Sequence, residues 1–370
     1  MKLLLIGGHM APALGFLSAV PHGTDVVYVG RQHVFEADEG ESLEQKTIRE
    51  RGLRFIAFRS GRVQRRLSRQ TIPSLLKIPK GFVQALQILK KEKPDIVIGF
   101  GGYLSVPLGI AAKMLGIPLL IHESTLRAGL ANKVLAAFAD CICISWESSR
   151  PYFPQKKITL TGNPLLPFVS SRTHLPLPES KEKLPLIMVT GGSGGSHVVN
   201  AIILQILPEL LEKAKVVHQT GDAHAFGDYK KLLAKKKMLP RKLQQRYSVV
   251  QFIHPEIINT VFAKADLVIG RSGINTVASL LVLRKKAILI PLLVGQKNEQ
   301  LNNAKLMESE GLATILDQKS LSAKILFTTI QDMLSHKTIE TAKWQIPVIT
   351  HGAEHMMKEV LRCVSSHNGK

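Results

Sequence analysis

The chain has 370 residues, of which 45% are hydrophobic and 21% are charged. Its 49 Lys and Arg residues exceed its 28 Asp and Glu residues, which gives a formal net charge of +21 at pH 7. The length predicts about two domains, and the apolar content excludes a mostly disordered chain. The positive charge favours an anionic partner (nucleic acid, an anionic membrane surface or a phosphorylated substrate), whereas an aromatic content of 5% argues against a protein that stacks single-stranded bases.

The N-terminal residues and the cysteines indicate where in the cell the protein is expected to work. The apolar run before Gly7 is too short for a signal peptide or a membrane span, and no other run approaches about 18 residues. We therefore expect a cytosolic chain with only peripheral membrane contact. Three cysteines are too few for a disulfide framework. The alternation over Asp140–Ser145 predicts a buried strand in which Cys141 and Cys143 are small hydrophobic side chains.

Short apolar runs alternate with segments of helical length along the whole chain. The predicted strands are Leu3–Ile6, Val26–Val29, Ile96–Ile98, Leu119–Ile121, Leu186–Val189, Val216–His218, Leu267–Ile269 and Ala287–Ile290. The clearest predicted helices are Ser74–Lys91, Ser105–Leu115, Val198–Lys213 and Ile274–Leu283. Strands that are apolar on both faces and alternate with helices indicate parallel α/β sheets.

The two halves of the chain begin alike. A strand runs into a glycine turn at Leu3–His9 and again at Leu186–His197, and the proline-rich stretch Phe168–Leu184 between them predicts a linker. The fold we expect is therefore α/β, with two doubly wound Rossmann-like domains whose parallel sheets face each other across a cleft. Ligands of such sheets bind beyond the carboxyl ends of the strands.

Three strand–glycine–helix junctions predict a phosphate-rich ligand. They are Gly99–Pro107, Gly191–Gly195 and Gly270–Val277. Glycines let the backbone approach a phosphate, and the N–H groups at a helix N-terminus favour its charge. Gly191–Gly195, with the Ser193 hydroxyl, fits a diphosphate but is neither a dinucleotide fingerprint nor a Walker A loop. A structural turn is the alternative.

Two titratable residues follow predicted strands, where a general base is useful. His9 comes after Gly7-Gly8, and Glu123 follows Leu119–Ile121 and His122. A lone histidine in such a place is more often structural. We expect no catalytic metal, because no Asp-x-Asp pair and no His/Cys cluster with ligand spacing occurs in the sequence.

Basic residues gather in two places. Residues 51–100 carry twelve Lys and Arg against Glu92 and Asp95. Here arginines precede an apolar helical stripe, which fits either a surface that lies on anionic lipid or a solvated face whose apolar residues belong to the core. The second cluster, Lys230–Arg246, has little apolar content at its centre and reads as a solvated helix.

Taken together, these stretches resemble the MurG family of peptidoglycan glycosyltransferases, which is related to glycosyltransferase family 28 and has the two-domain GT-B fold. In chain order the matching stretches are Gly7–Pro12, Gly99–Pro107, His122–Asn132, Gly162–Pro164, Gly191–Gly195, Arg271–Val277 and Gln300–Ala304. Each motif is weak by itself, but the ordered set is specific, and it extends from residue 1 to about residue 340.

The resemblance implies a reaction and a domain plan. The family transfers N-acetylglucosamine from UDP-N-acetylglucosamine to the 4-hydroxyl of undecaprenyl-diphosphate-linked MurNAc-pentapeptide (lipid I), with inversion, to give lipid II. It implies an acceptor and membrane-docking domain at residues 1–164 and a UDP-sugar domain at residues 165–340. Residues 341–370 would form a C-terminal helix that crosses back to the first domain.

The resemblance also assigns roles to residues. Catalytic roles fall to His9 and Glu123, either of which takes the acceptor proton. Donor-binding roles fall to Gly191, Gly192, Ser193, Gly194, Gly195, Phe252, Ile253, Arg271, Ser272, Gly273, Ile274, Ser279, Gln300 and Asn303. Acceptor-binding roles fall to Gly7, Gly8, Gly101, Gly102, Tyr103, Ser105, His122, Asn132 and Asn163. Membrane docking falls to Arg65, Arg66, Arg69, Ile72, Leu75, Leu76 and Phe82.

The expected partners are a UDP-sugar, a polyprenyl-diphosphate-linked glycopeptide and an anionic membrane surface, without nucleic acid. The expected location is the cytoplasmic face of the cell membrane, as a peripheral protein. No cofactor is expected, since UDP-N-acetylglucosamine is a substrate.

The sequence departs from the family pattern in several places. The first glycine loop is shortened, Ser124-Thr125 follows His122-Glu123, and Leu165-Leu166 replace the family's Arg after Gly-Asn-Pro. Ser279 stands where the family has an acidic residue that binds the ribose hydroxyls. A related GT-B transferase with another UDP-sugar donor or lipid acceptor is therefore the main alternative. A nucleic-acid-binding protein and a catalytically weak membrane scaffold are the others.

Overall fold

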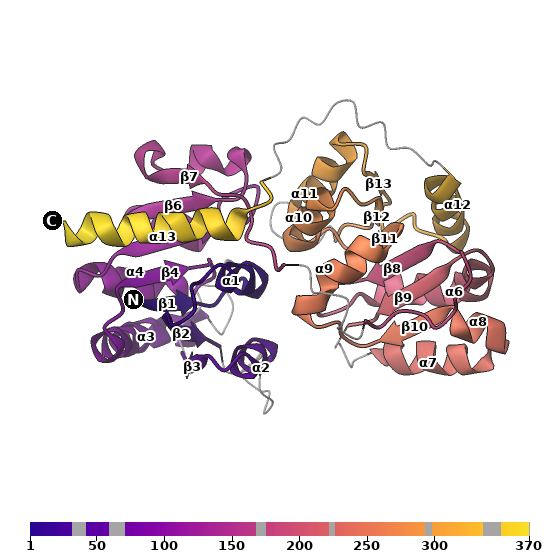
Figure 1. The fold of residues 1–370 in the computed structure, drawn as a ribbon, viewed down its shortest axis with the longest axis horizontal. Coiled ribbons are helices and arrows are strands. Elements are labelled where there is room, and N and C mark those ends of the chain that lie inside the picture. Colours follow the sequence, from indigo (N-terminus) through magenta and orange to yellow (C-terminus); the bar gives the residue numbers. More distant parts are fainter. Residues whose placement is uncertain are drawn as a thin grey trace. The chain divides into compact units, whose positions relative to one another are not determined.

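The computed structural model describes residues 1–31, 42–58, 71–167, 175–221, 226–292, 298–335 and 349–369. The chain divides into two compact units. Unit 1 comprises Met1–Leu166 together with Ile349–Lys370, and unit 2 comprises Pro167–Val348. Each unit has its own parallel sheet (Figure 1), which confirms the predicted α/β class with two Rossmann-like domains.

The sheet of unit 1 has seven strands in the order β3-β2-β1-β4-β5-β6-β7, and all its pairings are parallel. The strands are β1 (Lys2–Ile6), β2 (Asp25–Gly30), β3 (Arg54–Ala57), β4 (Ile96–Gly99), β5 (Leu119–Glu123), β6 (Cys141–Ile144) and β7 (Ile158–Leu160). Alternate side chains of β1 enter opposite cores: Leu4 and Ile6 lie in one, Leu3 and Leu5 in the other. Burial on both faces explains the unbroken apolar runs.

The helices of unit 1 connect these strands and cover both faces of the sheet. They are α1 (Met10–Leu17), α2 (Leu43–Glu50), α3 (Thr71–Glu92), α4 (Ser105–Met114) and α5 (Leu130–Leu135), with the 3-10 turns η1 (Glu147–Tyr152) and η2 (Gln155–Lys157). The last helix, α13 (Gly352–Asn368), returns to unit 1 and packs beside α1 and β6 (Figure 1). Its Met356, Val360 and Cys363 are buried in the same core as Leu3 and Leu5.

The sheet of unit 2 has six strands in the order β10-β9-β8-β11-β12-β13, again parallel throughout. The strands are β8 (Leu186–Thr190), β9 (Lys215–Gln219), β10 (Tyr247–Val250), β11 (Leu267–Gly270), β12 (Ala287–Leu289) and β13 (Ala313–Ile315). The helices are α6 (His197–Lys213), α7 (Asp228–Met238), α8 (Arg241–Gln245), α9 (Pro255–Lys264), α10 (Ile274–Val282), α11 (Glu299–Ser309) and α12 (Ala323–Ser335).

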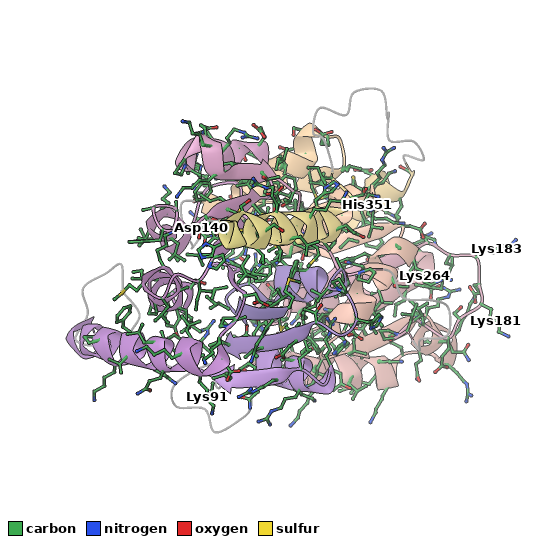
Figure 2. The ribbon with its side chains drawn as sticks, turned by 60° about the vertical axis from the view of Figure 1, so that its left-hand side comes forward. Lys91, Asp140, Lys181, Lys183, Lys264 and His351 are labelled. Atoms are coloured by element: carbon green, nitrogen blue, oxygen red, sulfur yellow. The ribbon has the colours of Figure 1, made fainter. Side chains whose placement is uncertain are left out.

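The predicted buried strand around Cys141 and Cys143 is confirmed, because β6 is buried along its whole length and both thiols are free. The second basic cluster forms α7 and α8, where Lys230, Lys231 and Lys237 are exposed, as expected of a solvated helix. Figure 2 shows Lys181 and Lys183 projecting from the segment that precedes β8. Among the described residues, no helix is both long enough and apolar enough to span a bilayer.

The structure describes only part of the predicted membrane-docking segment. Arg65, Arg66 and Arg69 lie outside the described residues. Ile72, Leu75 and Leu76 lie on the first turns of α3, and the structure does not describe the side chains of these three residues. Phe82 is half-buried and packs against the core of unit 1, and its role in membrane docking stays a prediction. The exposed face of α3 instead carries Lys80, Val83, Gln87 and Lys90, which recur at helical spacing, and its Val83 is 53% exposed.

Candidate functional site

The first candidate site lies in unit 1, where β1 and β4 end in glycine turns that touch each other. A Cβ on Gly8 would lie 2.1 Å from the carbonyl oxygen of Gly101, and one on Gly102 would lie 3.1 Å from the Cα of Gly8. Gly101 and Gly102 have φ values of 80° and 77°, a region that L side chains rarely adopt. Glycine is thus required on both turns, and the structure brings together the four predicted glycines Gly7, Gly8, Gly101 and Gly102.

His9 lies at this junction, as the N-cap residue of α1. Its side chain does not cap the helix, and it makes no hydrogen bond to any described part of the chain. The imidazole Cδ2 lies 3.2 Å from where a Cβ on Gly101 would be. A half-buried imidazole with both nitrogens available is suited to accept a proton from a ligand hydroxyl.

Glu123, the other predicted catalytic residue, is 2% exposed and already fully hydrogen-bonded. Its Oε1 accepts bonds from the Thr125 backbone N–H at 3.0 Å and the Thr125 hydroxyl at 2.6 Å. Its Oε2 accepts bonds from the Gly129 N–H at 2.9 Å and Asn132 Nδ2 at 3.0 Å. Three N–H groups donate to the carboxylate, and the Thr125 hydroxyl, with its one hydrogen, also lies 2.6 Å from the Arg127 carbonyl. Glu123 therefore supports the 124–129 loop in this structure, and its role as proton acceptor stays a prediction.

Four other predicted acceptor residues are buried as well. Ser105 donates its hydroxyl hydrogen to the carbonyl of Gly101 at 2.6 Å, and Asn132 donates to the carbonyl of His122 at 3.0 Å. His122 is 1% exposed and lies 3.0 Å from the Ser145 hydroxyl; burial lowers the pKa of His122 to about 3, so its ring is neutral near pH 7. Asn163 is 6% exposed. All four side chains are buried, and the Ser105 hydroxyl supports the Gly101-Gly102 turn.

Tyr103 remains at the surface of the site, with the Arg31 guanidinium 5.7 Å from its ring centre. Sequence reasoning missed this pair, because Arg31 follows β2 and lies far from Tyr103 along the chain. It also missed Glu44, which accepts a hydrogen bond from the Tyr28 hydroxyl at 2.7 Å and lies against Gly7. A cation and a carboxylate thus flank the unit 1 turns.

The second candidate site lies in unit 2, at the turn Gly191–Gly195 between β8 and α6. The Gly195 N–H donates to the Gly192 carbonyl at 3.1 Å, and the Ser196 hydroxyl caps α6 by accepting from the Val199 N–H. Within the described residues, the backbone N–H groups of Ser193, Gly194 and Ser196 have no protein acceptor. Unpaired N–H groups before a 17-residue helix form a site for a phosphate anion.

The ends of the neighbouring strands β9 and β10 adjoin this turn. A Cβ on Gly195 would lie 2.1 Å from the Thr220 carbonyl oxygen, and one on Gly221 would lie 2.1 Å from the Cα of Gly195. Sequence reasoning missed Gln219–Gly221; the signal was available, because these residues directly follow a predicted strand. Phe252 and Ile253 follow β10 at the same edge, and Ile253 is 3% exposed.

The polar side chains that follow β11 form hydrogen bonds to other residues of unit 2. The Arg271 guanidinium donates to the Ile290 carbonyl at 2.8 Å and to Gln318 Oε1 at 2.6 Å, and burial lowers its pKa. Ser272 donates to the Gln300 carbonyl at 2.7 Å and is fully buried. Ile274 and Ser279 are 5% and 6% exposed, whereas Gly273 is half-buried with open space beside its Cα.

Asn303 is expected to bind sugar hydroxyls, and that role stays a prediction. Its side chain is fully buried and donates to the Ser272 carbonyl at 3.0 Å, because it lies on the inward face of α11. Gln300, one turn earlier, is half-buried, and its Oε1 accepts from the Leu292 N–H at 2.9 Å. Its amide NH₂ group is the part of this pair that remains for a ligand. Among the described residues, no group of three or more His, Cys, Asp or Glu side chains is placed to hold a metal ion.

Comparison with known proteins identifies the family. Residues 6–144 match the model of the glycosyltransferase family 28 N-terminal domain, and residues 186–360 match that of its C-terminal domain. The chain is 31% identical over 336 residues to a protein of Staphylococcus aureus strain USA300 / TCH1516, with 90% of this chain and 89% of that protein covered. It is 29% identical over 365 residues to one of Clostridium perfringens strain SM101, with 96% of both chains covered.

Both relatives are named UDP-N-acetylglucosamine--N-acetylmuramyl-(pentapeptide) pyrophosphoryl-undecaprenol N-acetylglucosamine transferase. The crystal structure of Acinetobacter baumannii MurG is similar with a TM-score of 0.65 and 25% identity, covering 98% of this chain and 99% of that one. The two family models, the relatives and the structure span both units. The chain belongs to glycosyltransferase family 28.

Proposed function

We infer that this protein is the hexosyltransferase that moves N-acetylglucosamine from UDP-N-acetylglucosamine to lipid I and so forms lipid II for peptidoglycan synthesis. The observation that carries this conclusion is the match to transferases of that name along 90–96% of the chain, through both units. The glycine turns support it, because a glycosyl transfer needs one group that activates a hydroxyl and another that stabilises the leaving diphosphate.

The donor is proposed to bind in unit 2. The unpaired N–H groups of Ser193, Gly194 and Ser196, together with the positive end of α6, would meet the negative charge of the UDP diphosphate. The NH₂ group of Gln300 would bind a sugar hydroxyl. Backbone dipoles act without reorganisation as charge develops on the leaving oxygen, and the proposal includes no cofactor.

The acceptor is proposed to react at unit 1. The 4-hydroxyl oxygen attacks C1 of N-acetylglucosamine, the bond from C1 to the diphosphate oxygen breaks, and UDP leaves with the electron pair. Attack on the face opposite the leaving group inverts C1. His9 would accept the hydroxyl proton, since its imidazole has no hydrogen-bond partner among the described residues and borders the Gly101-Gly102 turn. Arg31, over Tyr103, would add positive charge for the acceptor diphosphate.

A peripheral position at the cytoplasmic face of the membrane is also proposed, because the acceptor is lipid-linked and the donor is a soluble nucleotide sugar. Its support is the exposed face of α3, where Val83 lies between Lys80 and Lys90. Lys91 extends the positive charge at the end of the helix (Figure 2). Lysines contribute about 1 kcal/mol each near an anionic membrane surface.

The decisive experiment is a transfer assay with a short-chain lipid I analogue and a panel of UDP-sugars. We expect transfer from UDP-N-acetylglucosamine to exceed that from the other donors by at least about a hundredfold. Preference for another UDP-sugar would instead support a related transferase with a different donor. No transfer from any UDP-sugar would overturn both.

A further inference from the structure

Gln219, the last residue of β9, links two parts of unit 2 that are separate in sequence. Its Nε2 donates a hydrogen bond to the Gly192 carbonyl at 2.8 Å, within the glycine turn. Its Oε1 accepts a hydrogen bond from the Ile253 backbone N–H at 3.1 Å, in the segment after β10. The strand order β10-β9-β8 explains this reach, because β9 lies between the strands that lead into these two segments.

The chemistry of the bridge requires a primary amide. The Gly192 carbonyl needs a donor and the Ile253 N–H needs an acceptor, and an amide supplies both from one planar group. The side chain is 4% exposed, so water cannot readily replace either bond. Only one orientation of the amide satisfies both partners, and the bridge therefore fixes the side chain as well as the two segments.

The surrounding backbone makes the bridge rigid. Next to Gln219, the Thr220 carbonyl contacts Gly195 and also accepts a hydrogen bond from Asn200 Nδ2 at 2.9 Å. The Gly192 carbonyl accepts a second bond from the Gly195 N–H at 3.1 Å. These bonds hold the backbone that carries the unpaired N–H groups of the turn. Among the described residues, Gln219 is the one side chain whose hydrogen bonds link this backbone to the 252–253 segment.

We propose that Gln219 is a positioning residue that holds the diphosphate-binding turn and the 252–253 segment in one geometry before the donor arrives. This inference rests on the proposed function, in which the turn binds the donor diphosphate, and on the donor-binding role that the family resemblance implies for Phe252 and Ile253. A ligand that spans two preformed segments loses less free energy to ordering than one that must assemble them. Gln219 touches no reacting atom, so it acts on donor affinity and leaves the chemical step to other groups.

Two variants dissect the bridge. Gln219→Met keeps the side-chain length but removes both hydrogen bonds, and Gln219→Glu keeps an acceptor for Ile253 while placing a carboxylate against the Gly192 carbonyl. We expect Gln219→Met to raise the Kd for UDP and the KM for UDP-N-acetylglucosamine by about tenfold, with kcat at saturating donor and the KM for acceptor within about twofold. Gln219→Glu should raise the Kd further, because its charge also repels the diphosphate.

Gln244→Met is the matched control. Gln244 is a half-buried glutamine of the same unit whose Nε2 donates to the Leu239 carbonyl at 2.8 Å, outside the glycine turn and the 252–253 segment. Its loss should lower Tm without changing the Kd for UDP. This separates a general loss of stability from a loss of donor geometry.

The outcomes distinguish the inference from the function on which it rests. If the wild type binds UDP and Gln219→Met binds it equally well, the inference is overturned while the proposed function stands. A fall in kcat at saturating donor with unchanged Kd would also overturn it, since that pattern assigns Gln219 to the chemical step. A wild type that binds no UDP would overturn the proposed function itself. If Gln219→Met fails to fold, the test rests on Gln219→Glu. A Kd for UDP equal to that of the wild type in Gln219→Glu would contradict the inference.

Discussion

The glycine turns after β1 and β8 have the same place in their sheets but present different chemistry. In unit 1 the turn after β1 packs against the Gly101-Gly102 turn. The group that it leaves without a hydrogen-bond partner among the described residues is the His9 imidazole, which precedes an eight-residue helix. In unit 2 the turn opens on the N–H groups of Ser193, Gly194 and Ser196, before a helix of 17 residues. One fold element thus exposes a titratable side chain in one unit and backbone dipoles in the other.

This difference indicates a division of labour. A group that accepts a proton must change its charge state during the reaction, which an imidazole side chain can do and a backbone N–H cannot. A group that stabilises a leaving diphosphate must hold a fixed positive potential, which helix and turn dipoles provide. The comparison therefore supports the proposal that the turn of unit 1 activates the acceptor and the turn of unit 2 binds the donor.

The largest expected effect is that of His9→Ala. Loss of a general base lowers kcat by about 10²–10⁴-fold, and the Kd for UDP should stay within about twofold because the donor turn belongs to the other unit. Steady-state kinetics and calorimetry measure the two quantities. His22→Ala, at a histidine outside the site, is the control, and wild-type turnover in His9→Ala would remove His9 from the mechanism.

Gly195→Ala should break the unit 2 turn. Its Cβ would lie 2.1 Å from the Thr220 carbonyl oxygen at a φ of 75°, so the turn must shift. We expect the Kd for UDP to rise by about a hundredfold or more, as the N–H groups lose their geometry. A Kd for UDP equal to that of the wild type would contradict the role given to the turn.

Acid should destabilise both units, through one buried neutral histidine in each. Burial lowers the pKa of His122 in unit 1 and of His218 in unit 2 to about 3. Below about pH 6.5 the unfolded chain binds a proton at each site that the folded chain does not, so stability falls as pH decreases from 6.5 towards 3. At pH 5 each site should cost about 2 kcal/mol.

Denaturant unfolding of the wild type and of His218→Asn, at pH 7 and pH 5, measures this dependence. The variant is less stable at pH 7 because the bonds to Asn200 and Tyr247 are altered, but its loss of stability between the two pH values should be smaller by about 2 kcal/mol. The same pH dependence in both proteins would show that His218 titrates normally in the fold.

The smallest effect concerns the exposed face of α3. Changing Lys80 and Lys90 to Glu should reduce the affinity for anionic vesicles by about thirtyfold, roughly 1 kcal/mol for each lysine removed. Cosedimentation with phosphatidylglycerol vesicles measures the affinity. The same double change at Lys237 and Lys242, exposed lysines of unit 2, is the control. Equal losses in the two double variants would assign the binding to net charge alone.

The sequence predicted the buried parts of the fold better than the edges. The central strands and α4, α6 and α10 lie within two residues of their predicted bounds, because strands buried on both faces form unbroken apolar runs. The strands β3, β7 and β13 are three or four residues long, and β10 is half-buried; all four lie at sheet edges, where the apolar signal is weak.

The sequence predicted where the candidate sites lie but not which of their side chains face a ligand. Glycine turns and strand ends located His9 and Gly191–Gly195 from the sequence. Whether a polar side chain faces a ligand or the protein depends on partners distant along the chain, as Ser272 and Asn303 show. The position of Glu123 after a strand predicts a general base. Its support of the loop is visible only from the hydrogen bonds that Thr125, Gly129 and Asn132 donate to its carboxylate.

The most direct test of the division of labour is the Kd for UDP, measured by calorimetry in His9→Ala and Gly195→Ala side by side. The account predicts a value within about twofold of the wild type for His9→Ala and a rise of about a hundredfold for Gly195→Ala. A His9→Ala protein that loses UDP affinity as strongly as Gly195→Ala does would contradict it, because donor binding would then depend on the turn of unit 1.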